Sequence, residues 1–151
     1  MKREHPAADA MPSRILEMPT WLISRAYAQS HRLLAEGFDT AGVRGYHYRL
    51  LAALEEFGPA SQAALGRRTS IDRSDVVAAL NELAERGLIE RSPDPDDGRR
   101  NIITITPAGI EELRTLDQIL VGVQEKLLAP LSPADRTQLI GLLTRLVEQD
   151  A

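Results

Sequence analysis

Arginines are the side chains of this sequence with the greatest capacity for specific chemistry. Of its 18 Lys and Arg residues, only Lys2 and Lys126 are lysine. A guanidinium is a planar set of donors that binds phosphate, carboxylate or the edge of guanine through two hydrogen bonds at once. Two short stretches concentrate these groups, one at Arg67, Arg68 and Arg73 and one at Arg99 and Arg100. Both stretches are candidate binding sites for an anionic partner.

Other kinds of chemistry are excluded or disfavoured by what the sequence lacks. It has no cysteine, which excludes disulfides, thiolate metal sites, a cysteine nucleophile and a thiol redox sensor. Its histidines, His5, His31 and His47, are not closely spaced, which disfavours a zinc site. It has neither a glycine loop that cradles phosphate nor a Ser/His/Asp arrangement. We therefore predict no catalytic residue, no metal and no cofactor, and a protein that is not an enzyme.

Length and composition are those of one globular domain. The chain has 151 residues, of which 43% are hydrophobic and 26% charged, and its formal net charge is −4. No apolar run approaches the roughly 18 to 20 residues of a membrane span, and the N-terminus has no apolar signal segment. We expect a cytoplasmic protein that does not enter the membrane. Residues 1–11 are polar and aperiodic and are expected to form a disordered tail.

Helical periodicity dominates the first half of the chain. A helix is expected from about Pro19 to about Glu36, after a short turn over Ser13–Met18, and Gly37 and Gly42 are expected to break it. Two more helices are expected over Val43–Phe57 and Ala60–Arg67. Asp72 is then the expected N-cap of a fourth helix, with Asp75 completing a capping box and Gly87 ending the helix.

The periodicity then changes to that of a β-hairpin. Leu88–Arg91 and the β-branched segment Ile102–Thr106 are expected strands, joined by a loop over Ser92–Arg100. Helix resumes with Thr106 as N-cap and Pro107 at the first helical position, and it is expected to continue to about Ala129. Ser132 begins the last helix.

This order of elements predicts a mainly α fold with a small β-hairpin wing. Residues 43–106 form a winged helix-turn-helix lobe, residues 12–42 an N-terminal dimerisation region and residues 107–151 C-terminal dimerisation helices, all within one domain over 12–151. The terminal helices have apolar faces that so small a lobe cannot cover. We therefore expect a homodimer in which these helices of two subunits interleave.

The helix-turn-helix suggests a specific use for the first arginine stretch. The second helix of such a motif enters the major groove of double-stranded DNA with its N-terminal residues at the base edges. Ser70, Arg73 and Ser74 lie at this end, and Arg73 can bind guanine through two hydrogen bonds. Arg67 and Arg68, at the end of the preceding helix, are expected to contact phosphate.

The wing suggests a use for the second stretch. Arg99 and Arg100 lie at the tip of the expected hairpin, where an arginine can reach into a narrow minor groove. Asp97 is expected to hold Arg99 by a charge-assisted hydrogen bond. One alternative is a solvated face of mixed charge. Another is a winged-helix module that binds protein instead of DNA.

Several motifs resemble the multiple antibiotic resistance regulator (MarR) family of bacterial transcription factors. The wing matches the family's pattern D-x-R-x5-[IL]-T through Asp97, Arg99, Ile105 and Thr106, and the segment 72–89 resembles its recognition helix and exit. The resemblance covers about residues 20–150. It implies a homodimer that binds a pseudo-palindromic operator and usually represses, in the bacterial cytoplasm at the nucleoid. Asp75 departs from the small or hydroxyl residue of many relatives, and either accepts from a cytosine amino group or caps the helix, which we favour.

The resemblance also implies a ligand cleft between the dimerisation helices and the DNA-binding lobe. Without cysteine, a peroxide sensor is excluded, which leaves a small aromatic or carboxylate effector, or none. Trp21 and Arg25 are four residues apart on the first helix and suit such a ligand. The alternative is that Trp21 packs at the dimer interface while Arg25 pairs with an acid. His47 is a further candidate contact, unless it is a buried or capping side chain.

Overall fold

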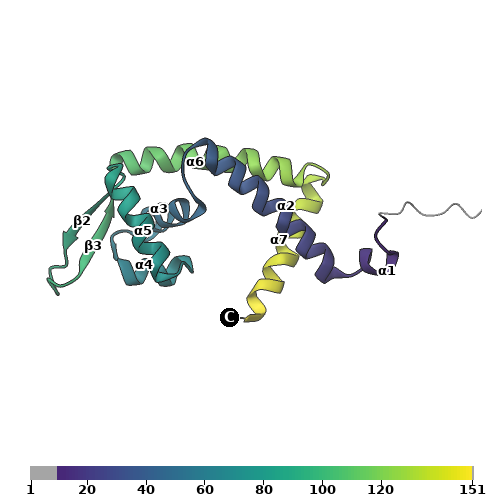
Figure 1. Ribbon diagram of the computed structural model, residues 1–151, viewed down its shortest axis with the longest axis horizontal. Coiled ribbons are helices and arrows are strands. Elements are labelled where there is room, and N and C mark those ends of the chain that lie inside the picture. The colour runs from purple at the N-terminus through teal and green to yellow at the C-terminus, as the bar shows by residue number, and fades with distance from the viewer. Residues whose placement is uncertain (1–9, 151) are drawn as a thin grey trace, which may run out of the picture.

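The computed structural model describes residues 10–150, and over this range the chain is mainly helical with three short strands (Figure 1). The helices are α1 (Ser13–Leu16), α2 (Pro19–Thr40), α3 (Gly45–Phe57), α4 (Gln62–Thr69), α5 (Arg73–Glu85), α6 (Pro107–Leu128) and α7 (Pro133–Val147), followed by a 3-10 turn at Glu148–Asp150. The strands are β1 (Ala60–Ser61), β2 (Ile89–Pro93) and β3 (Asn101–Ile105). The disordered tail predicted for residues 1–11 lies mostly outside the described residues.

The segment from α3 to β3 forms the expected winged helix-turn-helix lobe. Its antiparallel sheet has the order β1-β3-β2, with Ile103 opposite Ala60 on one side and Ile105 opposite Ile89 on the other. β2 and β3 extend from the lobe as the wing (Figure 1). Because β2 is an edge strand, it tolerates Pro93 as its last residue.

The predicted hairpin is confirmed, but β1 was not foreseen. We expected helix from Ala60, whereas Ala60–Ser61 is a strand paired with β3 and the helix begins at Gln62. Two residues are too few to display the alternation that marks a strand in sequence. Ser61 is also the N-cap of α4, because its hydroxyl accepts a hydrogen bond from the Ala64 N–H.

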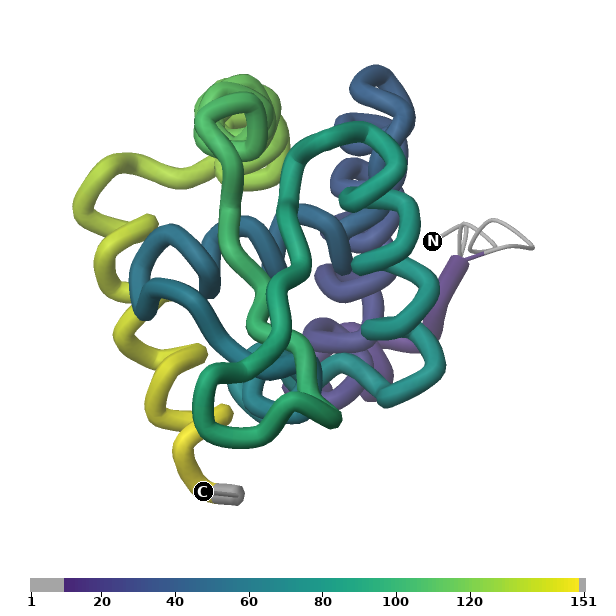
Figure 2. The backbone as a smooth tube through the Cα atoms, turned by 90° about the vertical axis from the view of Figure 1, so that its left-hand side faces the viewer, coloured from purple at the N-terminus to yellow at the C-terminus, as the bar shows by residue number. Residues whose placement is uncertain are grey.

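The core lies inside the lobe and under the first half of α6. Its fully buried side chains are almost all aliphatic and come from α3, α4, α5, β3 and α6: Leu50, Leu51, Leu54, Leu65, Val76, Leu80, Leu83, Ile103, Leu113 and Leu116. Seen along the length of the molecule, α6 is nearly end-on above the sheet (Figure 2). Complete burial of these groups stabilises each element against the others.

The prediction that Gly37 ends the first helix was wrong. α2 continues through Gly37 to Thr40 and packs against α6. A Cβ at Gly37 would lie 2.8 Å from a methyl group of Val123 and 3.1 Å from one of Ile119. Gly37 therefore allows the two helices to approach closely, and packing outweighs the low helix propensity of glycine.

Helix caps agree with the sequence at most ends. The Thr106 hydroxyl accepts from the Gly109 N–H at 3.0 Å and the Ser132 hydroxyl from the Asp135 N–H at 3.2 Å. Gly87 follows the end of α5 with a left-handed backbone (φ +70°), a conformation that glycine adopts without steric cost. The capping box predicted at Asp72 is not formed: Asp72 occupies the N-cap position of α5, but its carboxylate makes no capping hydrogen bond.

The terminal helices contrast with this lobe. Within α7, every residue of which the structure describes, none is buried, and Ile140, Leu142, Leu143, Leu146 and Val147 are between 42% and 75% exposed. The first half of α2 likewise leaves Leu22, Ile23 and Tyr27 exposed. α7 descends from the far end of α6 (Figure 1) and has no buried residue of its own.

Candidate nucleic-acid interface

A groove of about 800 Å³ lies between α4, the first turn of α5 and the wing. Five of its lining residues are arginines that come from three elements, α4, α5 and β2, and from the wing loop: Arg67, Arg73, Arg91, Arg99 and Arg100. Asp72 is the acidic residue in the same lining. Although the whole chain is acidic, this groove collects cationic groups, so its local potential attracts an anion.

The turn between α4 and α5 sets the position of Arg67 and Arg73. α4 ends at Ser70, which has a left-handed backbone (φ 53°) and donates its N–H to the Gly66 carbonyl. After Ile71 and the N-cap Asp72, α5 begins with Arg73, so its N-terminus faces the same groove as the last turn of α4. Ser70, Arg73 and Ser74 are all exposed, as a surface that reads a ligand requires.

The wing loop contradicts the pairing predicted for Asp97. Its carboxylate accepts from the backbone N–H of Arg99 at 3.1 Å, but the guanidinium that it approaches is that of Arg100, at 3.7 Å. Arg100 also pairs with Asp94 at 3.3 Å. Within residues 10–150, the Arg99 guanidinium has no ion-pair partner. The loop therefore holds Arg100 in place and leaves Arg99 free to reach outward.

Arg91 was missing from the residues predicted for this surface. It lies on β2 and lines the groove, and its guanidinium donates to the side-chain Oδ1 of Asn81 on α5 at 2.8 Å. This contact connects the wing to α5. The signal in the sequence is weak, because an isolated arginine on an edge strand is normally only a solvated side chain.

Arg68 differs from its neighbour Arg67. Its guanidinium lies over the Phe57 ring, 5.0 Å from the centroid, and it does not line the groove. Phe57 is itself 57% exposed, so the stacked pair forms a separate patch at the end of α3. The predicted phosphate contact of Arg68 stays a prediction.

A second cavity, of about 680 Å³, lies between α2, the start of α3 and α6. Its polar and aromatic lining consists of His31, Phe38, Asp39, Arg44, Tyr46, Tyr48 and Arg49. Trp21, Arg25 and His47, the ligand contacts expected from sequence, do not line it. Trp21 and Arg25 do share a face of α2, with the guanidinium 5.7 Å from the ring centroid. The sequence alone does not reveal this lining, because its residues come from three separate helices.

His47, in the first turn of α3, has a structural role. Its side chain is buried, and its Nδ1 accepts the backbone N–H of Arg44 at 2.9 Å, which caps α3. Its Nε2 lies 2.6 Å from a Glu82 carboxylate oxygen on α5. The imidazole is therefore the buried, capping side chain of the alternative stated above.

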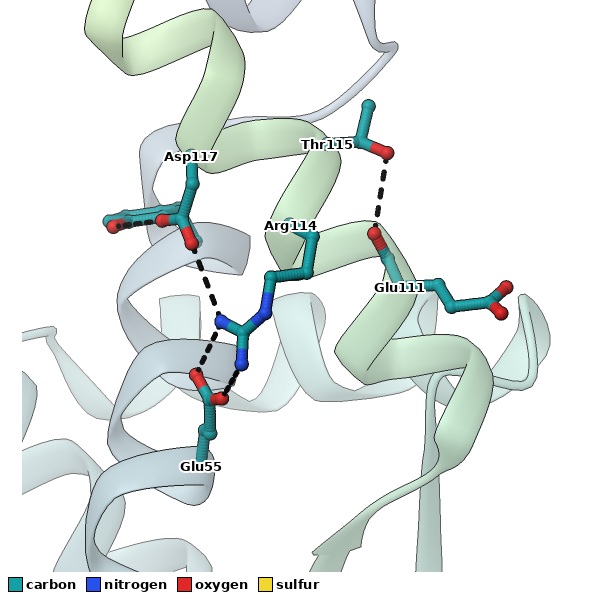
Figure 3. A network of polar contacts seen from close by, with 6 residues as sticks. Glu55, Glu111, Arg114, Thr115 and Asp117 are labelled. Atoms are coloured by element: carbon teal, nitrogen blue, oxygen red, sulfur yellow. Dashed lines mark hydrogen bonds and ion pairs between the residues drawn. The ribbon is translucent and has the colours of Figure 1, made fainter.

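A polar network connects the second cavity to α6 (Figure 3). The Tyr48 hydroxyl donates to Asp117 at 2.8 Å, while Arg114 pairs with Glu55 of α3 and lies 3.5 Å from Asp117. Partial burial raises the pKa of Tyr48, and the hydrogen bond to Asp117 raises it further because the neutral phenol is the donor. This network attaches α3 to α6 beside the cavity.

Residues 10–150 contain no group of three or more His, Cys, Asp or Glu side chains arranged to hold a metal ion. Over the same residues, none of the helices combines the length and hydrophobicity needed to cross a membrane.

Comparison with known proteins gives consistent matches. The model of the MarR family matches residues 41–100. A putative transcriptional regulatory protein for the hcr operon of Thauera aromatica is 38% identical over 112 residues, which are 74% of this chain and 68% of that protein. The transcriptional repressor NicR of Pseudomonas putida is 25% identical, over 94% of this chain and 90% of its own. The PcaV regulator of Streptomyces coelicolor, solved in complex with its natural ligand, superposes with a TM-score of 0.70 at 27% identity, over 94% of this chain and 99% of its own.

Proposed function

Because this chain belongs to the MarR family of transcriptional regulators, we propose that it binds double-stranded DNA as a homodimer and represses transcription from a pseudo-palindromic operator. The observation that carries the proposal is the groove whose lining contains five arginines from α4, α5 and the wing. Repression is supported by the likeness to NicR, whose name describes a repressor.

Each arginine has a proposed task set by its place. α5 enters the major groove, where Arg73 in its first turn binds a base edge, while Ser70 and Ser74 lie beside it. Arg67 and Arg68, in the last turn of α4, contact phosphates. Arg99, free of ion pairs within the described residues, enters the minor groove, and Arg100 stays on the wing loop with Asp97.

The homodimer is proposed from the exposed apolar faces of the terminal helices. Leu142, Leu146 and Val147 of α7 and Ile23 and Tyr27 of α2 are each at least 46% exposed in one chain. A second copy would cover these groups, with residues 12–42 and 107–151 as the dimerisation regions and residues 43–106 as the DNA-binding lobe. Twofold symmetry would then present two grooves to one pseudo-palindrome.

An effector is assigned to the second cavity. Arg44 and Arg49 offer charge for a carboxylate, and Tyr46 and Tyr48 offer aromatic rings, so a small aromatic acid fits its chemistry. The ligand-bound PcaV structure supports a small-molecule effector. Trp21 and Arg25 lie outside this cavity, and Trp21 is assigned to packing at the dimer interface, the alternative considered for it from sequence.

The test begins with a duplex selected by the protein itself from random sequences. In fluorescence anisotropy, Arg73→Ala should weaken binding by about 1–3 kcal/mol and relax the preference at one base position. Arg99→Ala should weaken binding to all duplex sequences by the same factor, because an arginine in the minor groove responds mainly to the width and potential of the groove. Arg145→Ala removes the same charge from exposed α7, away from the groove, and serves as the matched control.

Dependence on salt decides between DNA and a protein partner. Binding through several phosphate contacts must weaken steeply as salt rises, because neutralised phosphates release counterions. If no duplex is enriched and added DNA gives no salt-dependent binding, the DNA-binding function is refuted and a protein-binding winged helix becomes the better description.

A further inference from the structure

We propose that His47 is a positioning residue that transmits occupancy of the second cavity to α5, the proposed DNA-reading helix. The inference rests on the proposed function, since it assumes an effector in this cavity and DNA at α5. It adds a physical route between the two sites.

The two ring nitrogens of His47 have different hydrogen-bonding roles: one accepts and the other donates. Nδ1 accepts the Arg44 N–H at 2.9 Å, so this nitrogen carries a lone pair. The ring proton must then lie on Nε2, which donates to the Glu82 carboxylate at 2.6 Å. Only one tautomer of the imidazole satisfies both contacts, and the contact with Glu82 is therefore a hydrogen bond from a neutral ring to a carboxylate.

One end of this chain of hydrogen bonds lies at the cavity, and the other lies on α5, toward the end of the helix opposite Arg73. Arg44, whose N–H is the first donor, lines the cavity together with Gly45 and Tyr46. Glu82, the last acceptor, belongs to α5, whose first residue is Arg73. His47 is buried between them, with only 4% of its surface exposed, so it can neither rotate freely nor exchange these partners for water.

The remaining contacts between α3 and α5 lack this directionality. Leu50 and Leu51 of α3 share one aliphatic core with Leu80 and Leu83 of α5, and aliphatic packing tolerates small sliding movements. The hydrogen bonds of His47 do not, because they weaken steeply when donor and acceptor lose alignment. A ligand that draws Arg44 toward the cavity therefore moves the imidazole, and with it the Glu82 end of α5.

The absence of cysteine allows a test that needs no knowledge of the natural effector. Ala35→Cys introduces one thiol in the lining of the cavity, and benzyl methanethiosulfonate then attaches a small aromatic group to it through a mixed disulfide. Mass spectrometry verifies the label. The labelled and unlabelled forms are compared by affinity for the selected duplex and by hydrogen exchange of the α5 backbone amides without DNA. We expect the label to weaken DNA binding about tenfold and to accelerate exchange in α5.

Removing the Glu82 contact should uncouple the two sites. In a Glu82→Ala background, the label should change DNA affinity by less than about threefold and leave exchange in α5 unaltered. Glu85→Ala truncates an exposed glutamate of the same helix and should retain the full effect of the label. Glu82→Gln retains an oxygen that accepts from Nε2 and should restore the response, which loss of a negative charge alone would not explain.

Three results separate the possible failures. An equal response to the label in the Glu82→Ala and Glu85→Ala backgrounds overturns the role of His47 while leaving the effector cavity intact. A label that alters neither DNA affinity nor exchange in α5, in the chain with Glu82 present, overturns both the cavity as effector site and the route through His47. Failure of every form to bind DNA, with a normal exchange response, refutes the proposed function but supports the route.

Discussion

The winged lobe buries most of its apolar side chains, whereas the terminal helices leave many of theirs exposed. In the lobe, Leu50, Leu80 and Leu83 are completely buried and the exposed groups are largely polar or charged. In α7, Leu142, Leu143 and Leu146 are between 42% and 51% exposed. Both regions have helices of similar amphipathic pattern, but only one contains enough neighbouring elements to cover the apolar face.

This difference indicates which region is complete in one chain. The lobe and the first half of α6 enclose a core and present cationic groups outward, so a single copy already forms the groove. The terminal helices α2 and α7 contribute long apolar faces and little core. An exposed apolar surface of this extent is normally an interaction site. The comparison predicts that substitutions in the lobe act on folding, whereas substitutions in the terminal helices act on association.

The largest effect is expected in the lobe. Leu80→Ala leaves a cavity in a site with 0% exposure and should lower the free energy of unfolding by about 2–5 kcal/mol, as measured by urea denaturation at fixed protein concentration. Val77→Ala, on the same helix but 37% exposed, should cost no more than about 1 kcal/mol. Similar costs for the two variants would contradict the assignment of the core to this lobe.

A smaller effect, on association and not on folding, is expected in the terminal helix α7. Leu146→Asp introduces a charge on the exposed apolar face of α7, and losing one buried leucine per subunit should raise the dimer dissociation constant at least about tenfold. Sedimentation equilibrium measures this change. Thr137→Asp, an exposed position in the first part of α7, should leave association unchanged. A Leu146→Asp dimer as tight as the parent would show that this face of α7 is not buried by a partner.

The smallest effect concerns the boundary between the two regions, where Tyr48 donates to Asp117 of α6 (Figure 3). Because the folded chain raises the pKa of Tyr48, its contribution to stability is complete below the pKa of an unfolded tyrosine, about 10, and is lost as pH rises above that value. Tyr48→Phe should therefore unfold more easily than the parent at pH 8, with the difference shrinking as the solution becomes more alkaline. Chemical denaturation across this range measures it.

The matched control is Tyr27→Phe, which removes a hydroxyl from a side chain that is 68% exposed. Its stability should follow that of the parent at every pH. A constant difference between Tyr48→Phe and the parent up to strongly alkaline pH would contradict the role of the hydroxyl at this boundary.

Local patterns in the sequence were enough to predict the helices, the hairpin and most caps. Thr106-Pro107 and Ser132 start helices because their hydroxyls accept nearby N–H groups, and this requires only neighbouring residues. The clustering of Arg67, Arg73 and Arg99 at the turn and the wing followed from the same local reading. These predictions succeeded because the interactions that decide them span a few residues.

The features that the sequence did not predict depend on contacts between distant segments. β1 exists because β3 is available to pair with it, and α2 passes Gly37 because Val123 and Ile119 of α6 pack there. Arg91 joins the groove through Asn81, and His47 becomes a buried cap that reaches Glu82 on another helix. Sequence spacing cannot encode such pairings, since each depends on where the folded backbone brings residues that are far apart in the chain.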